Sequence, residues 1–165
     1  MNQKGKLVRD KIPDLIRANG HLPILGECKH YRVLLCEKLV EETYELTQAM
    51  GRDALIEECA DIKEVLEELC RERKMLKPAL PLSGQSSTRD LRWELHDHGR
   101  LVKRSVGAVG VLEGFISFFA RTLDQLCISA KELQQAQDKK RTERGGFAKR
   151  RVLLYTMSPE SAVAP

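Results

Sequence analysis

Two stretches of sequence decide the fold: Lys38-Leu-Val-Glu-Glu-Thr-Tyr-Glu-Leu46 and Leu55-Ile-Glu-Glu-Cys-Ala-Asp-Ile62. Each belongs to a segment in which apolar residues recur every three or four positions, as on one face of an α-helix. The apolar positions are Leu35, Leu39, Leu46 and Ala49 in the first segment, and Leu55, Ile62, Val65 and Leu69 in the second. A carboxylate fills the missing position of each series, Glu42 in the first and Glu58 in the second. The pattern predicts two packed helices with acidic residues inside their seam.

Two pairs of carboxylates therefore share helix faces, since Glu42 and Glu45, like Glu58 and Asp61, are three residues apart. A carboxylate in a helix–helix interface is unfavourable unless a cation meets it. If the helices pack along their seams, the four groups converge as hard oxygen donors with no Cys/His cluster beside them, which favours Mg²⁺ over zinc. We predict that these four residues bind Mg²⁺, with Mn²⁺ as a substitute. Either pair alone would be a weak signal, because Glu-rich helices show such spacings by chance.

The composition favours an all-α fold, since helix-forming residues are plentiful, aromatic residues make up 5% of the chain and clear strand alternation is absent. The metal hairpin would lie within a helix bundle that is completed by oligomerisation. The helices are expected at residues 6–19, 30–50, 52–74 and 105–139. We predict a single domain at 1–156 with a long helical insertion at about 79–138, followed by a disordered tail at 157–165.

Charge is distributed unevenly along the chain. Residues 37–72 carry twelve acidic and four basic side chains, whereas residues 139–151 carry seven basic and one acidic. An acidic metal site flanked by basic segments suits a polyanion that arrives with its metal, such as a nucleoside triphosphate. The alternative reading of the charge alone is a solvated acidic helix pair with a basic tail.

Nothing in the sequence indicates secretion or membrane insertion. The chain opens without a signal sequence and its five cysteines have no CxxC spacing, so we expect a cytoplasmic protein. The most apolar stretch, residues 114–130, is interrupted by Arg121 and Asp124 and is too short to span a bilayer. We therefore expect no membrane partner.

Three blocks of sequence resemble a known superfamily. Glu42-x-x-Glu45 followed by Glu58-x-x-Asp61 resembles the signature of the all-α nucleotide pyrophosphohydrolases, the MazG-like and phosphoribosyl-ATP pyrophosphohydrolase-like superfamily. Lys6-Leu-Val-Arg-Asp-Lys-Ile-Pro13 and Lys38-Leu-Val-Glu-Glu look like the N-terminal motif and the metal-helix entry of one branch. Glu143-Arg-Gly-Gly-Phe147 resembles the C-terminal motif of that branch. The blocks cover roughly residues 5–75 and 139–154.

The resemblance implies an Mg²⁺-dependent, homodimeric or higher-order enzyme that cleaves a nucleotide to its monophosphate and pyrophosphate, often in nucleotide-pool house-cleaning. By position, the four carboxylates would hold Mg²⁺. Glu41 or Glu45 would accept the proton of the attacking water, and Lys38 would reach a phosphate. Further candidates for substrate binding are the basic residues Lys6, Arg9, Lys11 and Arg144, the backbone of Gly145 and Gly146, and Phe147, which would pack or stack on a base.

The middle of the chain departs from the superfamily pattern. Residues 79–138 are longer than the corresponding segment of short members, which leaves the substrate and the oligomeric geometry open. Trp93 and the acidic and histidine residues at 94–98 are candidates for contact with a base or metal, although His-x-His in a loop is more often solvated. A competing hypothesis is a non-catalytic helical interaction module that retains the fold. Binding of nucleic acid through residues 139–151 is disfavoured, because the acidic hairpin would repel a phosphate backbone.

Overall fold

The computed structural model describes residues 5–72 and 108–158. The contacts divide the chain into two compact units, residues 1–77 with 131–165, and residues 78–130. The described elements, in chain order, are β1 (Lys6–Val8), α1 (Ile12–Ala18), β2 (Leu22–Gly26), α2 (Tyr31–Gln48), α3 (Arg52–Glu72), α4 (Ala108–Gln125), α5 (Ala130–Arg144) and β3 (Arg151–Met157). The expected helical fold is thus confirmed, but a small sheet accompanies the helices. Trp93, residues 94–98 and the part of the expected insertion at 79–107 lie outside the described residues.

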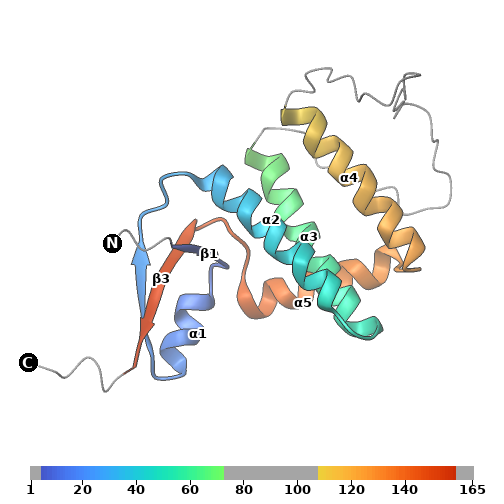
Figure 1. Ribbon diagram of the computed structural model, residues 1–165. Coiled ribbons are helices and arrows are strands. Elements are labelled where there is room, and N and C mark those ends of the chain that lie inside the picture. Colours follow the sequence, from blue (N-terminus) through green and yellow to red (C-terminus); the bar gives the residue numbers. More distant parts are fainter. Residues whose placement is uncertain (1–4, 73–107, 159–165) are drawn as a thin grey trace, which may run out of the picture. The chain divides into compact units, whose positions relative to one another are not determined.

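The predicted hairpin is formed by α2 and α3, which lie side by side along their length (Figure 1). Only residues 49–51 join the two helices, and Gly51 has φ 86°, a left-handed conformation that glycine adopts at little cost. Three of the four seam residues predicted for α3 are buried, since Ile62, Val65 and Leu69 are at most 3% exposed, whereas Leu55 is half-buried. Glu42 is also buried at 4% exposure, as its place in the apolar series of α2 requires.

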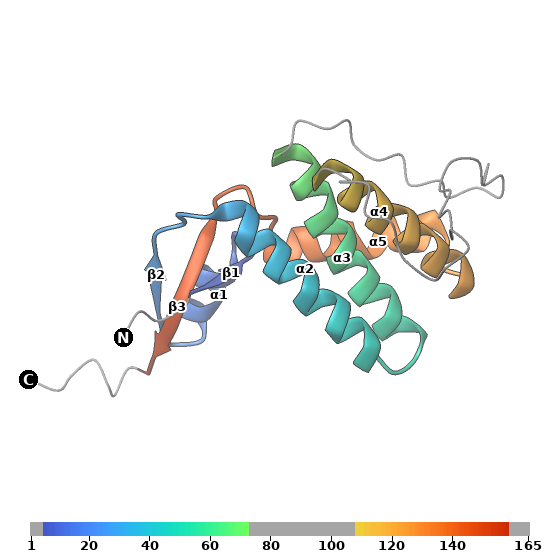
Figure 2. The same ribbon diagram turned by 45° about the horizontal axis from the view of Figure 1, so that its top comes forward.

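The sheet has the order β1-β3-β2, with β3 antiparallel to both neighbours (Figure 2). Leu7 pairs with Val152 and Ile24 pairs with Tyr155, so strands from the two ends of the chain meet in one sheet. This sheet corrects the all-α prediction. Residues 6–8 form a strand instead of the first turn of a helix, and Met157 belongs to β3 instead of the tail.

The single helix expected at 105–139 is divided between α4 and α5. The chain turns at residues 126–129, where Cys127 has φ 52° and its N–H donates to the carbonyl of Asp124. In the unit of residues 78–130, one stripe of α4 is buried, with Leu112, Phe119 and Leu123 at most 7% exposed. α5 belongs almost entirely to the other unit, where Leu133 and Gln137 are fully buried. None of the described helices is both long enough and apolar enough to cross a membrane.

Candidate metal centre

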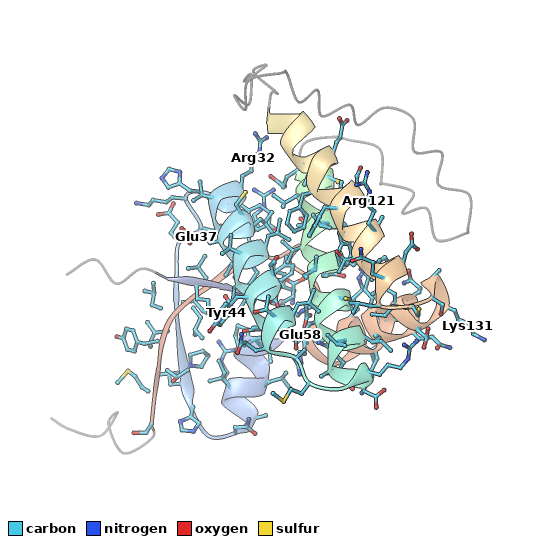
Figure 3. The ribbon with its side chains drawn as sticks, turned by 45° about the vertical axis from the view of Figure 1, so that its right-hand side comes forward. Arg32, Glu37, Tyr44, Glu58, Arg121 and Lys131 are labelled. Atoms are coloured by element: carbon cyan, nitrogen blue, oxygen red, sulfur yellow. The ribbon has the colours of Figure 1, made fainter. Side chains whose placement is uncertain are left out.

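The α2–α3 hairpin brings three carboxylates together at its seam. Glu42 of α2 and Glu58 and Asp61 of α3 each offer one oxygen, and these oxygens lie within 4.8 Å of one another. Glu42 and Asp61 are buried at 4% and 6% exposure, whereas Glu58 is half-buried. Figure 3 shows Glu58 at the hairpin. The three groups are close enough to share one divalent ion.

A second group of carboxylates overlaps the first. Oxygens of Glu41, Glu42 and Glu45 also lie within 4.8 Å of one another, so Glu42 belongs to both groups. Glu45 is exposed and Glu41 is half-buried, which places them at the open rim of the cluster. The four predicted ligands thus gather as two overlapping sets around Glu42, with Glu45 at the edge.

Cationic side chains already meet part of this cluster. Lys38 Nζ lies 2.5 Å from Glu42 Oε1 and 2.9 Å from Glu41 Oε1, and Lys6 Nζ lies 2.6 Å from the same Glu41 oxygen. Arg9 and Lys140 hold the two oxygens of Asp61: the Arg9 guanidinium bonds Oδ1, and Lys140 Nζ lies 2.5 Å from Oδ2. The internal ion pairs therefore supply part of the positive charge that we expected a metal ion to provide.

Glu58 is the carboxylate that these cations leave unmatched. Its Oε2 is buried and has no hydrogen-bond partner, and within the described residues neither Glu58 nor Glu45 forms an ion pair. Burial raises the pKa of Glu58, and the charges of Asp61 and Glu45 raise it further against the opposing effect of Lys140. An orphaned carboxylate oxygen among hard oxygen donors fits a divalent cation such as Mg²⁺.

Glu42 shows the same shortage of positive charge. Burial raises its pKa to about 7 although Lys38 opposes the shift, and the neighbouring charges of Asp61 and Glu45 add to the increase. Glu41 behaves in the opposite way: burial would raise its pKa, but hydrogen bonds from Lys6 and Lys38 hold the pKa below the usual 4.5. The electrostatic strain of the cluster is therefore concentrated at Glu42 and Glu58.

The N-terminal and C-terminal motifs of the sequence meet in a set of hydrogen bonds that we call the terminal clasp, formed by residues 9–11 and 144–149. The N–H groups of Asp10 and Lys11 donate to the carbonyls of Gly146 and Arg144, at 2.7 and 3.0 Å. In return, the N–H groups of Ala148 and Lys149 donate to the Asp10 carboxylate at 3.1 and 2.8 Å. The anion bound by this backbone loop is thus a side chain of the protein itself.

The clasp requires glycine at position 145. Gly145 has φ 79°, and a Cβ there would lie 3.0 Å from Asp10 Cβ and 3.2 Å from the backbone nitrogen of Lys11. The Gly145 carbonyl accepts a 3.0 Å hydrogen bond from Arg9 Nη1. The clasp therefore holds the guanidinium that contacts Asp61. Arg9 and Gly145 support the carboxylate cluster through this contact.

Other predicted binding residues lie elsewhere. Phe147 is 1% exposed, its ring lies beneath the Arg9 guanidinium at 5.3 Å, and its carbonyl accepts a hydrogen bond from Tyr31 at 2.8 Å. It packs in the core, and the alternative of stacking on a base does not fit this position. Lys11 donates to the carbonyl of Thr142 at 2.6 Å near the end of α5, and no ion pair between Lys11 and the cluster is found among the described residues. The Asp10 carboxylate belongs to the clasp, and Lys11 stands at the N-cap of α1.

Two grooves lie beside the cluster. The smaller, of about 180 Å³, is lined by Lys6, Lys38 and Glu41 together with residues of β1 and α2. The larger, of about 360 Å³, runs between α3 and α5, and its lining includes Glu57, Lys139, Lys140 and Arg144. The basic candidates Lys6 and Lys38 thus share one groove, while Arg144 lines the other.

The sequence analysis missed two features of the site. Lys140, 4% exposed, was counted only as part of the basic segment, although it contacts Asp61. The second feature is a polar network between α3 and α5, in which Arg141 binds Glu64 and Glu67 at 2.6 Å each. The side chain of Gln137 also donates to Glu64, at 2.8 Å. The acidic residues that recur every three or four positions along α3 could have indicated this network from the sequence. Their spacing does not show which of them have ion-pair partners.

The comparisons with known proteins assign no family. No family model matches the chain, and no solved structure matches it significantly. A protein of Mycolicibacterium smegmatis described as uncharacterized is 46% identical over 54 residues, which is 32% of this chain and 55% of that relative. The match spans about half of the relative's length.

Proposed function

We propose that this protein is an Mg²⁺-dependent nucleoside triphosphate pyrophosphohydrolase that releases a nucleoside monophosphate and pyrophosphate. The observation that carries the proposal is the buried, unpartnered Oε2 of Glu58 beside Glu42 and Asp61. A scaffold has no use for a buried charge without a partner, whereas a metal-dependent enzyme needs carboxylate oxygens free to bind a cation. House-cleaning of the nucleotide pool is the corresponding cellular role.

In this proposal Glu42, Glu58 and Asp61 hold the metal, and Glu45 completes the set at the rim. Bound Mg²⁺ would neutralise phosphate oxygens and lower the pKa of a water molecule. Glu45 is better suited than Glu41 to accept the proton of that water, because Glu41 is occupied by Lys6 and Lys38 and its pKa is lowered.

The smaller groove is the proposed phosphate side of the site. Lys6 and Lys38 line it next to Glu41, and the Lys6 side chain, although paired with Glu41, is 58% exposed and therefore accessible to a ligand. A lysine ammonium on a flexible stem follows a phosphate that changes position during reaction. Arg144, which lines the larger groove, is a second candidate for neutralising phosphate charge.

The test is release of pyrophosphate from a panel of canonical and modified (d)NTPs with millimolar Mg²⁺. We expect release by the wild type and a loss of at least about a hundredfold in Glu58→Gln and Glu42→Gln. The matched control is Glu27→Gln, in which the same change affects an exposed residue that pairs with Lys29. If no nucleotide yields pyrophosphate above the level of a Glu42→Gln/Glu58→Gln double variant, the alternative of a non-catalytic helical interaction module replaces the enzyme.

A homodimer is part of the proposal. Val33, Val40 and Tyr44 of α2 are 55%, 71% and 65% exposed, and they form an apolar stripe on the helix that carries Glu42. A stripe of this kind is typical of a helix that packs against a second copy of the chain. Val40→Glu should therefore lower the mass measured by sedimentation equilibrium to that of the monomer, and a wild type that is already monomeric would contradict the dimer.

A further inference from the structure

Asp61 differs from the other carboxylates of the cluster because cations occupy both of its oxygens. Arg9 bonds Oδ1 and Lys140 bonds Oδ2, whereas Lys38 contacts only one oxygen of Glu42. Glu58 keeps a buried oxygen with no partner at all. A divalent ion can therefore bind Glu42 and Glu58 without breaking an ion pair, but it meets a cation on either side of Asp61.

The two cations of Asp61 are held in different ways. The Arg9 guanidinium is 6% exposed, donates to the Gly145 carbonyl at 3.0 Å and lies over the Phe147 ring. The guanidinium therefore cannot move away from Asp61 without giving up its hydrogen bond to the carbonyl of Gly145, which lies in the terminal clasp. A planar guanidinium with several fixed donors is the more rigid partner.

The Lys140 side chain has an alternative set of contacts beside Asp61. Its ammonium also binds the carbonyl of Glu57 at 2.9 Å and lies 3.8 Å from Glu57 Oε2. It already lines the groove of about 360 Å³ between α3 and α5. Because the stem of lysine is flexible, the ammonium can turn toward Glu57 and this groove while α5 stays in place.

A retained ammonium would oppose metal binding. A divalent ion held by Asp61 would lie within a few ångströms of Lys140 Nζ, which is 2.5 Å from Oδ2. Repulsion at such a distance is strong in a partly buried site, where solvent screens charges poorly. The divalent ion and the Lys140 ammonium therefore cannot both contact Asp61 at low energy.

We propose that Lys140 is the resident counter-ion of Asp61 in the metal-free protein, and that a divalent ion displaces it into the groove between α3 and α5. The proposal rests on the metal site of the proposed function. It assigns Lys140 a competing role: this residue lowers the affinity for metal and keeps Asp61 neutralised until metal binds. Arg9 remains on the opposite oxygen as the fixed positioning residue.

The first arm of the test measures Mg²⁺ affinity by isothermal titration calorimetry. Lys140→Met should bind Mg²⁺ roughly tenfold more tightly than the wild type, since it removes the competing charge. Lys140→Arg, which keeps a cation, should not gain affinity. The matched control is Lys139→Met, which removes the same charge from the neighbouring residue. The Lys139 side chain is 63% exposed and its Nζ lies 3.7 Å from Glu57 Oε1. This control should change the affinity for Mg²⁺ less than about twofold. Weaker Mg²⁺ binding by Lys140→Met would overturn the proposal, because it would make Lys140 a support for Asp61.

The second arm uses the wild-type protein, so it does not depend on whether Lys140→Met folds. Amine acetylation is quantified by mass spectrometry at each lysine with and without Mg²⁺. Lys140 should be protected without metal, since its side chain is 5% exposed, and several-fold more reactive with saturating Mg²⁺, while Lys139 stays constant. Unchanged protection of Lys140 at saturating Mg²⁺ would overturn the exchange.

The outcomes separate this inference from the proposed function. Pyrophosphate release with Lys140 still protected overturns the exchange alone. Mg²⁺-dependent exposure of Lys140 without pyrophosphate release from any nucleotide overturns the activity alone. If the wild type does not bind Mg²⁺ at millimolar concentration, both are overturned together.

Discussion

Two clusters of acidic residues on the same helix have opposite electrostatic character. In the network between α3 and α5, Glu64 and Glu67 are bound by Arg141, and Lys63 lies 3.3 Å from Glu67. Burial would raise the pKa of Glu67, but Lys63 and Arg141 outweigh it and lower that pKa. Two turns earlier, Glu58 has a buried oxygen without a partner and a raised pKa.

The comparison separates acids with a structural role from the acids that we propose to bind a metal. Acids whose cations are built into the chain hold α5 to α3 and need no ligand. Buried carboxylates without enough positive charge nearby destabilise the folded state. Such groups are found most often at functional sites. Burial alone does not make the distinction, because Glu42 and Glu64 are equally buried at 4% exposure.

The largest expected effect on stability comes from breaking the satisfied cluster. Arg141→Met leaves Glu64 and Glu67 without their shared guanidinium, and should lower the free energy of unfolding by about 3 kcal/mol. The measurement is urea unfolding followed by circular dichroism in EDTA, with Lys139→Met as the exposed control expected to change it by less than about 0.5 kcal/mol. A loss no greater than that of the control would mean that the network is not structural.

The second prediction concerns pH in the metal-free protein. The pKa of Glu42 is about 7 in the folded state and its usual value is 4.5, so both states are protonated at lower pH. As pH rises from about 4.5 to about 7, the unfolded chain ionises first, and the folded state loses the stability contributed by protonated Glu42. Stability relative to Glu42→Gln should therefore fall by about 3 kcal/mol across this range and then level off.

The reference variant in this experiment removes the contributions of the other titrating groups, which the two proteins share. Urea unfolding of both proteins in EDTA at half-unit pH intervals supplies the measurement. A wild type that gains stability relative to Glu42→Gln with rising pH would show that Lys38 fully compensates Glu42, and the contrast between the clusters would be lost.

The smallest expected effect comes from removing the unmatched charge. Glu58→Gln keeps the shape of the side chain and should leave the metal-free fold unharmed or stabilise it by about 1 kcal/mol at pH 7. The same variant should lose most of the rise in melting temperature that millimolar Mg²⁺ gives the wild type. Both are measured by differential scanning fluorimetry, with Glu27→Gln as control. Strong destabilisation without metal would place Glu58 among the structural acids.

Part of this architecture follows from local sequence. The carboxylates of the hairpin could be located because Glu42 and Glu58 fill gaps in apolar series with the period of a helix. The sheet could not be found in this way. β1 has three residues and β2 five, and both pair with β3 from the other end of the chain. Strands this short show no local periodicity from which they could be predicted. The turn at Cys127 was missed because the apolar series continues through it.

The helical hairpin and the gathering of its acids could be predicted from the sequence, because helical periodicity is a property of neighbouring residues. Which of those acids are neutralised depends on contacts between distant parts of the chain. Asp61 receives Arg9 from 52 residues away and Lys140 from 79 residues away, and Glu58 receives no partner within the described residues. Such pairings depend on where distant elements pack, and they set the electrostatic balance that a metal ion would have to complete.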